Sequence, residues 1–159
     1  NVELIRAMPT TSSRFNKGIT ASLNISSTPS TYNKAKKMFN KVGMVIELKK
    51  EQEMDTFTGL VGSGPAYFFY LLKAYEKRLI KLCNNDSALT AKAMSGLLEG
   101  VALSLEDGSS IDDLIKKVAS KKGTTEAGLK SFKKNKLLSS FDKGISAAVN
   151  RSKEIASES

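Results

Sequence analysis

The chain has 159 residues, with 25 Lys and Arg against 16 Asp and Glu, no His, no Trp and a single Cys. Without His there is no Ser-His-Asp triad, no Cys-His dyad and no His-ligated metal, and one Cys forms neither a thiolate zinc site nor an internal disulfide. We therefore expect no metal site, and any catalysis has to use hydroxyls, carboxylates, lysines or a bound cofactor. The length and the 40% apolar content suit one packed domain, or a small domain with an appendage.

The first 48 residues predict the order strand, strand, helix, strand. The predicted strands are residues 4–9, 18–24 and 44–48. Ser27-Thr28-Pro29 predicts a helix start, with Ser27 or Thr28 as the cap and Pro29 in the first turn, and Gly43 ends the helix. Three strands and one helix cannot close a core of their own. We therefore expect the chain to begin, at Asn1, partway through an α/β sheet.

Helical periodicity dominates after about residue 50. The helix that follows Ser63-Gly64-Pro65 is apolar on nearly all sides in its first half, which predicts burial on most sides. The next helix has small residues at three- to four-residue spacing, which lets another backbone approach closely. The predicted helices are residues 66–82, 87–105, 111–119, 124–133 and 137–155. Such a small all-α unit often completes its burial in a dimer.

The distribution of charge is uneven along this helical part. Nine lysines lie between Lys116 and Lys143, against Glu126 and Asp142 alone, in a chain of net charge +9. Such a patch could bind nucleic-acid phosphates. No nucleic-acid-binding motif accompanies it, however, and a solvated helical face is the favoured interpretation. No signal segment opens the sequence, and no uncharged stretch approaches the roughly 20 residues that span a bilayer, so we expect a cytoplasmic protein without a membrane partner.

Two glycine-bearing helix starts are candidate ligand sites. At Gly62-Ser63-Gly64-Pro65, free backbone N–H groups could receive an anion, but a structural turn is the better interpretation and the dinucleotide spacing G-x-G-x-x-G is absent. In the segment Ser120 to Glu126, Gly123 supplies a turn, Thr124 caps the helix, and Glu126 is favourable near its positive end. The alternative interpretation of the second start is a pocket for one small carboxylate. Local residues alone favour capping.

Several segments, taken in order, resemble the C-terminal portion of pyrroline-5-carboxylate reductase over essentially all 159 residues. They are Arg6-Ala7-Met8-Pro9, Val42-Gly43 followed by Glu47, the run from Asp55 through Gly62-Ser63-Gly64-Pro65-Ala66-Tyr67, Gly100, and Gly123-Thr124-Thr125. Each is weak alone, and their order and separation make them specific together. The resemblance implies a mainly α fold, with the remnant of an α/β Rossmann sheet over residues 1–49 and a helical dimerisation and substrate-binding domain over residues 50–159.

This resemblance implies hydride transfer from NADPH or NADH to the C=N carbon of 1-pyrroline-5-carboxylate, which gives L-proline in the last step of proline biosynthesis. A cyclic imine is basic enough to be protonated, so the reaction needs neither His nor a metal. The resemblance also implies a homodimer or a higher oligomer, whose helices interleave so that each active site uses both subunits.

The family's functional residues carry over to two segments. The substrate-binding residues would be Ser120, Gly123, Thr124 and Thr125, and Thr125 would be the catalytic residue, as proton donor to the imine nitrogen or as its orienter. Ala7, Met8 and Pro9 would border the nicotinamide side of the cofactor.

The sequence departs from the family pattern in three ways. After Met-Pro it has Thr10, Thr11 and Ser12 instead of Asn and Thr-Pro, and before Gly-Thr-Thr it has Lys121 and Lys122 instead of Pro-Gly. The strand, Gly-rich turn and helix that hold the pyrophosphate in a Rossmann domain are not found in it.

We therefore expect the chain to be inactive alone. The alternative hypothesis is a non-enzymatic helical dimerisation module, the remnant of a decayed reductase. A third, weaker hypothesis is anion or nucleic-acid binding by residues 116–143.

Overall fold

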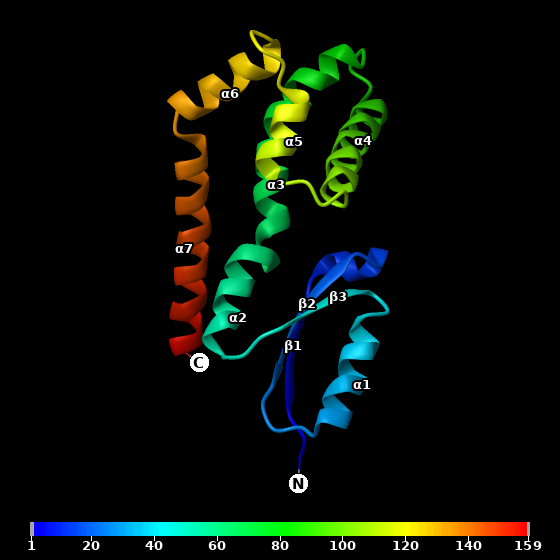
Figure 1. Ribbon diagram of the computed structural model, residues 1–159, viewed down its shortest axis with the longest axis vertical. Helices are drawn as coiled ribbons and strands as arrows, with labels where there is room; N and C mark the ends of the chain where they lie inside the picture. Colours follow the sequence, from blue (N-terminus) through cyan, green and yellow to red (C-terminus); the bar gives the residue numbers. More distant parts are fainter. Residues whose placement is uncertain (1, 159) are drawn as a thin grey trace. The chain divides into compact units, whose positions relative to one another are not determined.

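The computed structural model of the protein describes residues 2–158 (Figure 1). By the contacts between its residues, the chain divides into two compact units. The first unit comprises Asn1–Pro65 and Lys143–Ser159, and the second comprises Ala66–Asp142. Two helices, α3 (Gly64–Leu82) and α7 (Leu137–Glu158), have residues in both units. The units group residues by contact, so the domain boundary expected after residue 49 stays a prediction.

The first unit contains a three-stranded sheet of order β1-β2-β3. β1 (Ile5–Pro9) is antiparallel to β2 (Gly18–Asn24), and β3 (Gly43–Glu47) is parallel to β2. Helix α1 (Pro29–Phe39) links β2 to β3, which makes β2-α1-β3 a βαβ unit (Figure 1). The predicted order of strands and helix is confirmed. A short 3₁₀ helix, Thr11–Phe15, lies between β1 and β2 and was not predicted.

Helix α1 is fixed at its start and on its buried face. Thr28 is the cap, and its hydroxyl oxygen accepts a hydrogen bond from the N–H of Thr31 at 3.3 Å. Pro29 occupies the first turn, where its missing N–H costs nothing. The buried Tyr32 donates from its hydroxyl to the carbonyl oxygen of Ser22 in β2 at 3.1 Å. The predicted cap is therefore confirmed as Thr28.

The core of the first unit lies between the sheet and the segment that follows it. Ala21 and Leu23, which alternate along β2 and so point to the same face, pack with Met54 and Phe57 of α2 (Gln52–Phe57). All four side chains are at most 6% exposed. Four partly buried side chains surround this cluster: Met8, Ile19, Leu48 and Val61.

A π-helix, Thr58–Gly62, connects α2 to α3 (Gly64–Leu82). Its wide turn is marked by the N–H of Ser63, which donates to the carbonyl oxygen of Thr58 at 2.9 Å. Pro65 has no N–H to give to the preceding turn, so a regular α-helical ladder cannot run through this point. Helix α3 therefore begins at Gly64, two residues earlier than predicted.

Helix α7 (Leu137–Glu158) returns to the first unit and packs on this π-helix. A Cβ atom at the buried Gly59 would lie 2.6 Å from both the backbone N and the Cγ2 of Val149. Ser152 Oγ donates to Asp55 Oδ1 at 2.8 Å, across 97 residues of sequence. The glycine allows α7 to approach the π-helix at backbone distance.

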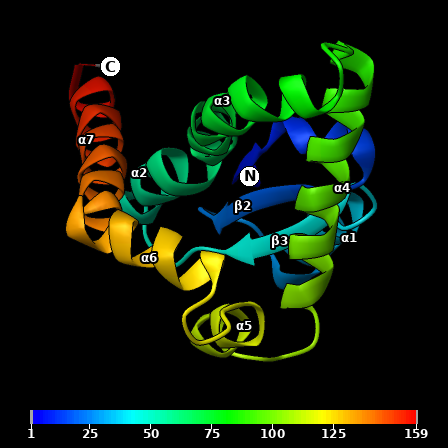
Figure 2. The same cartoon turned by 90° about the horizontal axis from the view of Figure 1, so that it is seen from above.

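The second unit is helical. It contains most of α3, then α4 (Ser87–Leu105), α5 (Ile111–Val118), α6 (Thr124–Lys134) and the start of α7. Figure 2 shows the short α5 between α4 and α6. Phe141 at the start of α7 stacks edge-on against Tyr67 of α3, with ring centroids 6.0 Å apart. The predicted helices of this part are confirmed, with ends that differ by at most three residues.

Large apolar side chains of α3 and α4 are exposed in the single chain. Phe68, Phe69 and Tyr70 are 58, 67 and 74% exposed. The predicted burial of this half of α3 is therefore wrong for the isolated chain, although the ring of Phe68 lies 6.4 Å from that of Phe141 in α7. Helix α4 is also the one helix among residues 2–158 that could cross a membrane by length and composition, a test that core helices of other proteins pass too. Exposed apolar surface on this scale marks an interaction surface.

Candidate functional site at the start of helix α6

The turn between α5 and α6 contains the residues predicted to bind substrate. Helix α6 begins at Thr124, and its N-cap is Gly123, with no side-chain cap hydrogen bond. The expectation that Thr124 caps the helix is therefore wrong by one residue. Its hydroxyl is not used to close the helix end.

Gly123 is required by the tightness of this turn. Its N–H donates to the carbonyl oxygen of Ser120 at 3.0 Å, and a Cβ atom on it would lie 2.3 Å from Ser120 Oγ. A larger residue would have to push the Ser120 side chain away. The turn thus brings the hydroxyl of Ser120 close to the first residues of α6.

The first backbone N–H groups of α6 are a further feature of this turn. Among the described residues, the N–H groups of Thr124 and Thr125 make no hydrogen bond. They belong to the first turn of a helix, where N–H groups lack intrahelical acceptors and the helix dipole is positive. Two free donors and nearby hydroxyls at such an end suit one small anion.

Lys122 has the one unusual backbone conformation of the turn. Its φ is 59°, in the left-handed region that favours glycine. The family pattern named above has glycine at this position. Glu126 accepts a hydrogen bond from the Lys122 N–H through Oε2 and pairs with Lys130 Nζ through Oε1 at 2.8 Å. The bond from Lys130, together with the one from Lys122, holds the pKa of Glu126 below its usual value, so this carboxylate is charged at neutral pH.

Thr125 also lines a cavity of about 430 Å³ between α4, α5 and α6. The wall is mostly apolar and includes Val101, Leu105, Ile111, Leu114, Val118 and Leu129. Small-molecule sites have volumes of roughly 300–1,000 Å³ and combine apolar walls with a few polar groups. A small molecule with a carboxylate and an apolar ring could therefore use the α6 start and this cavity together.

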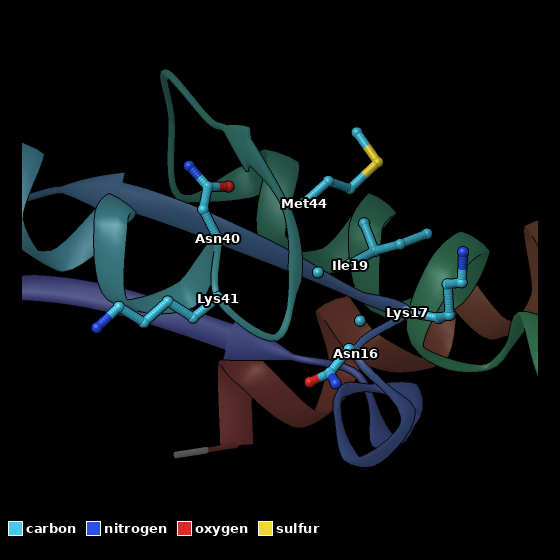
Figure 3. Close-up of a pocket in the computed structure, with 8 residues that line it drawn as sticks. Asn16, Lys17, Ile19, Asn40, Lys41 and Met44 are labelled. Atoms are coloured by element: carbon cyan, nitrogen blue, oxygen red, sulfur yellow. The ribbon is translucent and has the colours of Figure 1, made fainter.

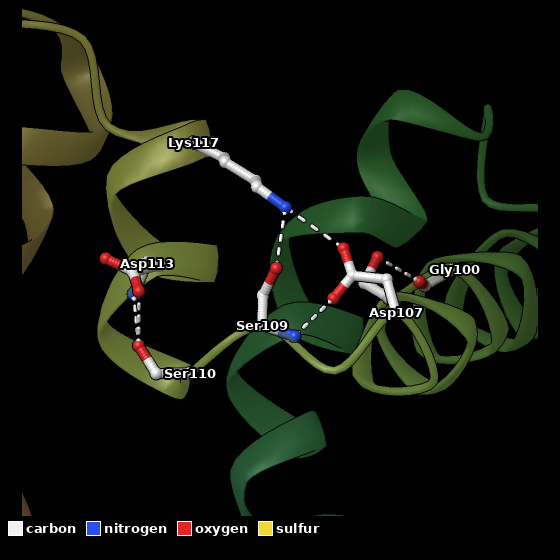
Figure 4. Close-up of polar contacts among 7 residues, drawn as sticks. Gly100, Asp107, Ser109, Ser110, Asp113 and Lys117 are labelled. Carbon is white, nitrogen blue, oxygen red and sulfur yellow. Dashed lines mark hydrogen bonds and ion pairs between the residues drawn. The ribbon is translucent and has the colours of Figure 1, made fainter.

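The turn between α4 and α5 fixes one side of the cavity (Figure 4). Lys117 Nζ donates to Asp107 Oδ2 at 3.0 Å and to Ser109 Oγ at 2.9 Å, while Asp107 Oδ1 accepts from the Ser109 N–H at 2.7 Å. The Ser109 N–H, and then Lys117, hold the pKa of Asp107 at about 2. The ammonium group of Lys117 is therefore paired with Asp107 and Ser109, although Lys117 is among the residues that line the cavity.

The residues predicted to border the nicotinamide lie at the end of β1, in the first unit. Met8 is half-buried, with its Sδ 3.3 Å from Thr58 Oγ1 of the π-helix. Its Cε would lie 3.1 Å from a Cβ atom at Gly62. Met8 thus joins β1 to the π-helix, and Ala7 and Pro9 flank it in the strand.

Thr10, which departs from the family pattern, has a structural role. Its Oγ1 accepts a hydrogen bond from the N–H of Ile19 at 3.0 Å and lies 2.9 Å from Ser12 Oγ. The hydroxyl therefore closes the connection between β1 and β2.

The start of α1 does not fit a dinucleotide pyrophosphate. In a Rossmann fold the pyrophosphate lies on free N–H groups at the start of a βαβ helix, after a glycine-rich turn. Here the turn from Asn24 to Thr28 has no glycine, and the carboxylate of Glu3 accepts from the N–H of Thr28 at 2.7 Å and from Thr31 Oγ1 at 2.5 Å. These bonds, the one from Thr31 first, lower the pKa of Glu3 to about 2.

Glu3 was missed by sequence reasoning. The 25 residues that separate it from Thr28 leave no local pattern to find it.

A second cavity, of about 420 Å³, lies at the edge of the sheet where β2 and β3 begin (Figure 3). Asn16, Lys17, Ile19, Asn40, Lys41 and Met44 are among its lining residues. The side chains of Lys17 and Lys41 extend in different directions, and the N–H of Gly18 is donated to the carbonyl oxygen of Val42 at 2.9 Å. Its polar groups do not converge, so we assign it no ligand. Among residues 2–158 no group of three or more Cys, Asp or Glu side chains is placed to hold a metal.

The sequence model of one family, described as pyrroline-5-carboxylate reductase dimerisation, matches residues 51–155. The chain is 30% identical over 158 residues to the pyrroline-5-carboxylate reductase of Staphylococcus epidermidis, across 98% of this chain and 58% of that protein. It is 32% identical over 156 residues to pyrroline-5-carboxylate reductase 1 of Bacillus subtilis, across 98% of this chain and 52% of that protein. The chain thus spans little more than half the length of these relatives.

Solved structures of the same kind match the fold. The pyrroline-5-carboxylate reductase of Coxiella burnetii superimposes with a TM-score of 0.82 at 31% identity, over 96% of this chain and 57% of that one. The Plasmodium falciparum pyrroline carboxylate reductase, solved with NADP bound, gives a TM-score of 0.82 at 26% identity, over 96% of this chain and 58% of that one. The predicted resemblance and the mainly α fold class are confirmed.

Proposed function

Because this chain belongs to the pyrroline-5-carboxylate reductase dimerisation family, we propose that it forms the dimerisation and substrate-binding part of an NAD(P)H-dependent pyrroline-5-carboxylate reductase. The reaction is hydride transfer to the C=N carbon of 1-pyrroline-5-carboxylate, which gives L-proline. The observation that carries the proposal is the start of α6, where two N–H groups that have no partner among the described residues lie beside an apolar cavity lined by Thr125.

Each part of this site has one task. The N–H groups of Thr124 and Thr125 and the hydroxyl of Ser120 bind the substrate carboxylate, and Gly123 keeps the turn tight enough to present them. The apolar cavity holds the carbon atoms of the ring and excludes water. The hydroxyl of Thr125 orients the imine nitrogen or gives it a proton. Positioning of this kind is the main contribution a protein makes to cofactor-driven hydride transfer.

The cofactor side of the proposal is limited to the nicotinamide. NADPH or NADH supplies the hydride, and Ala7, Met8 and Pro9 border its nicotinamide ring. Since the carboxylate of Glu3 occupies the start of α1, we expect that the described residues do not hold the pyrophosphate. We therefore expect these residues alone not to reduce the substrate.

The partner of the chain is a second copy of itself, bound through the exposed apolar side chains of α3 and α4. A homodimer or a higher oligomer would cover this surface. The apolar side chains of the second unit would then be buried against the partner, since the hydrophobic core cluster of the described residues lies in the first unit. We place the protein in the cytoplasm, with neither a nucleic acid nor a membrane as partner.

The substrate site is tested by NMR titration of the chain with L-proline, the reaction product. The amide signals of Gly123, Thr124 and Thr125 should shift together and saturate. Thr125→Val removes one hydroxyl hydrogen bond and should weaken proline binding by roughly three- to tenfold. Thr56→Val is the matched control, since Thr56 is exposed on α2 in the other unit. Absence of any shift at Gly123–Thr125 contradicts the proposal and favours a dimerisation module without a substrate.

A further inference from the structure

We propose that Glu126 is a positioning residue, which keeps the substrate-binding turn in its working shape by fixing the backbone N–H of Lys122. This inference rests on the proposed function of the Ser120–Thr125 turn. It adds a residue that acts on the ligand through the backbone and does not touch it.

The turn contains a backbone conformation that its sequence disfavours. Lys122 has a φ of 59°, whereas the following Gly123 has a φ of −83°. For a residue with a side chain the left-handed region is disfavoured by roughly five- to thirtyfold relative to the right-handed one. Left to itself, the turn would leave this conformation, and the N–H groups of Thr124 and Thr125 would no longer stay next to Ser120.

Glu126 opposes this tendency from within the helix. It is the third residue of α6, the position from which a Glu side chain reaches back to a preceding N–H in a capping box. The nearest such N–H, on Gly123, is already donated to Ser120. Glu126 therefore binds the N–H of Lys122, one residue earlier, and this bond exists only while Lys122 stays left-handed.

The carboxylate of Glu126 is held from both sides. One oxygen accepts from Lys122 N, and the other lies 2.8 Å from Lys130 Nζ, one turn further along α6. The Glu126 side chain is 35% exposed, against 75% for Lys130. The ion pair balances the negative charge near an anion site. Neither Lys121 nor Lys122 has an ion-pair partner among the described residues, so the surroundings of the turn stay positive.

The experiment compares four variants of the chain by NMR. Glu126→Ala should lose the left-handed φ at residue 122, seen in backbone couplings and in faster exchange of the Lys122 N–H, and should bind L-proline about fivefold or more weakly. Lys122→Gly in the same chain should restore both, because glycine adopts this conformation freely. Glu126→Gln keeps an acceptor and should recover most of the affinity. Lys130→Ala breaks only an exposed ion pair and should change affinity less than about twofold.

The outcomes separate the two proposals. If the wild-type chain binds no proline, the function proposed for the turn is wrong and the assignment of Glu126 falls with it. If the wild type binds and Glu126→Ala binds equally well, or loses affinity that Lys122→Gly does not restore, the positioning role alone is overturned. Restored affinity in the double variant supports it, since a general loss of stability would not be repaired by that glycine.

Discussion

An acidic residue among the exposed apolar side chains of α4 should separate the homodimer that we propose. Leu97, Val101 and Leu105 recur every four residues along this helix and are 46, 55 and 50% exposed. They therefore lie along one side of α4, where Val101 and Leu105 also line the cavity between α4, α5 and α6. The change Val101→Asp places a carboxylate between Leu97 and Leu105. It removes no ion pair or side-chain hydrogen bond of the described residues.

The magnitude follows from the exposure of Val101. Complete burial of a valine side chain contributes about 1.5 kcal/mol. About half of that remains to be gained in each protomer, so a twofold interface loses roughly 1.6 kcal/mol when both valines are replaced. Each carboxylate adds a desolvation penalty of at least about 1 kcal/mol. The dimer should weaken by about 4 kcal/mol, or roughly a thousandfold in dissociation constant.

Sedimentation equilibrium over a wide range of protein concentration measures this change, and circular dichroism checks that the helices remain. Phe15→Asp is the control, because Phe15 is an exposed apolar residue, 63% exposed, in the 3₁₀ helix of the first unit, whereas α4 belongs to the second unit. A wild-type chain that sediments as a monomer, or a Val101→Asp variant that dimerises as tightly as Phe15→Asp, refutes the assignment of this surface.

Two further predictions concern the first unit. Gly59→Ala puts a Cβ atom 2.6 Å from the backbone N of Val149 and should destabilise the chain by about 1–3 kcal/mol in urea unfolding. Gly100→Ala, where the added carbon meets no atom within 4 Å beyond its chain neighbours and the nearby backbone of its own helix, should instead stabilise it by about 0.5–1 kcal/mol; equal effects of the two changes would falsify the packing of α7. The pKa of Glu3 is lowered from 4.5 to about 2, so its contribution to stability is complete above pH 4.5 and is lost as the pH falls towards 2. Glu3→Gln should flatten that part of the stability curve, and an NMR titration midpoint of Glu3 near 4.5 speaks against the contact with α1.

Elements specified by neighbouring residues were predictable from the sequence. Thr28 followed by Pro29 carries its own start signal, and the structure places the cap there. The bounds predicted for α4, residues 87–105, agree with the structure because Asp86 precedes the helix as a cap and the apolar period ends at Leu105. In the same way, Gly123 marks the turn before α6, which begins at Thr124, whereas a ligand at Gly123-Thr124-Thr125 rests on the family resemblance and stays a prediction.

Features that depend on distant contacts were not predictable. The π-helix at Thr58–Gly62 lies where α7 packs on Gly59, from about 90 residues away. The carboxylate of Glu3 reaches the start of α1 across 25 residues. The exposure of Phe69 contradicts a burial inferred from its helix alone. In each case the deciding partner is another segment, or another chain, that a local pattern does not name.

The most direct test is a pair of calorimetric titrations of the chain, one with L-proline and one with NADPH. The account predicts saturable binding of proline that Thr125→Val weakens, and no binding of NADPH, since Glu3 occupies the start of α1. Tight binding of NADPH without binding of proline would contradict both the substrate site at α6 and the absence of a cofactor pyrophosphate site.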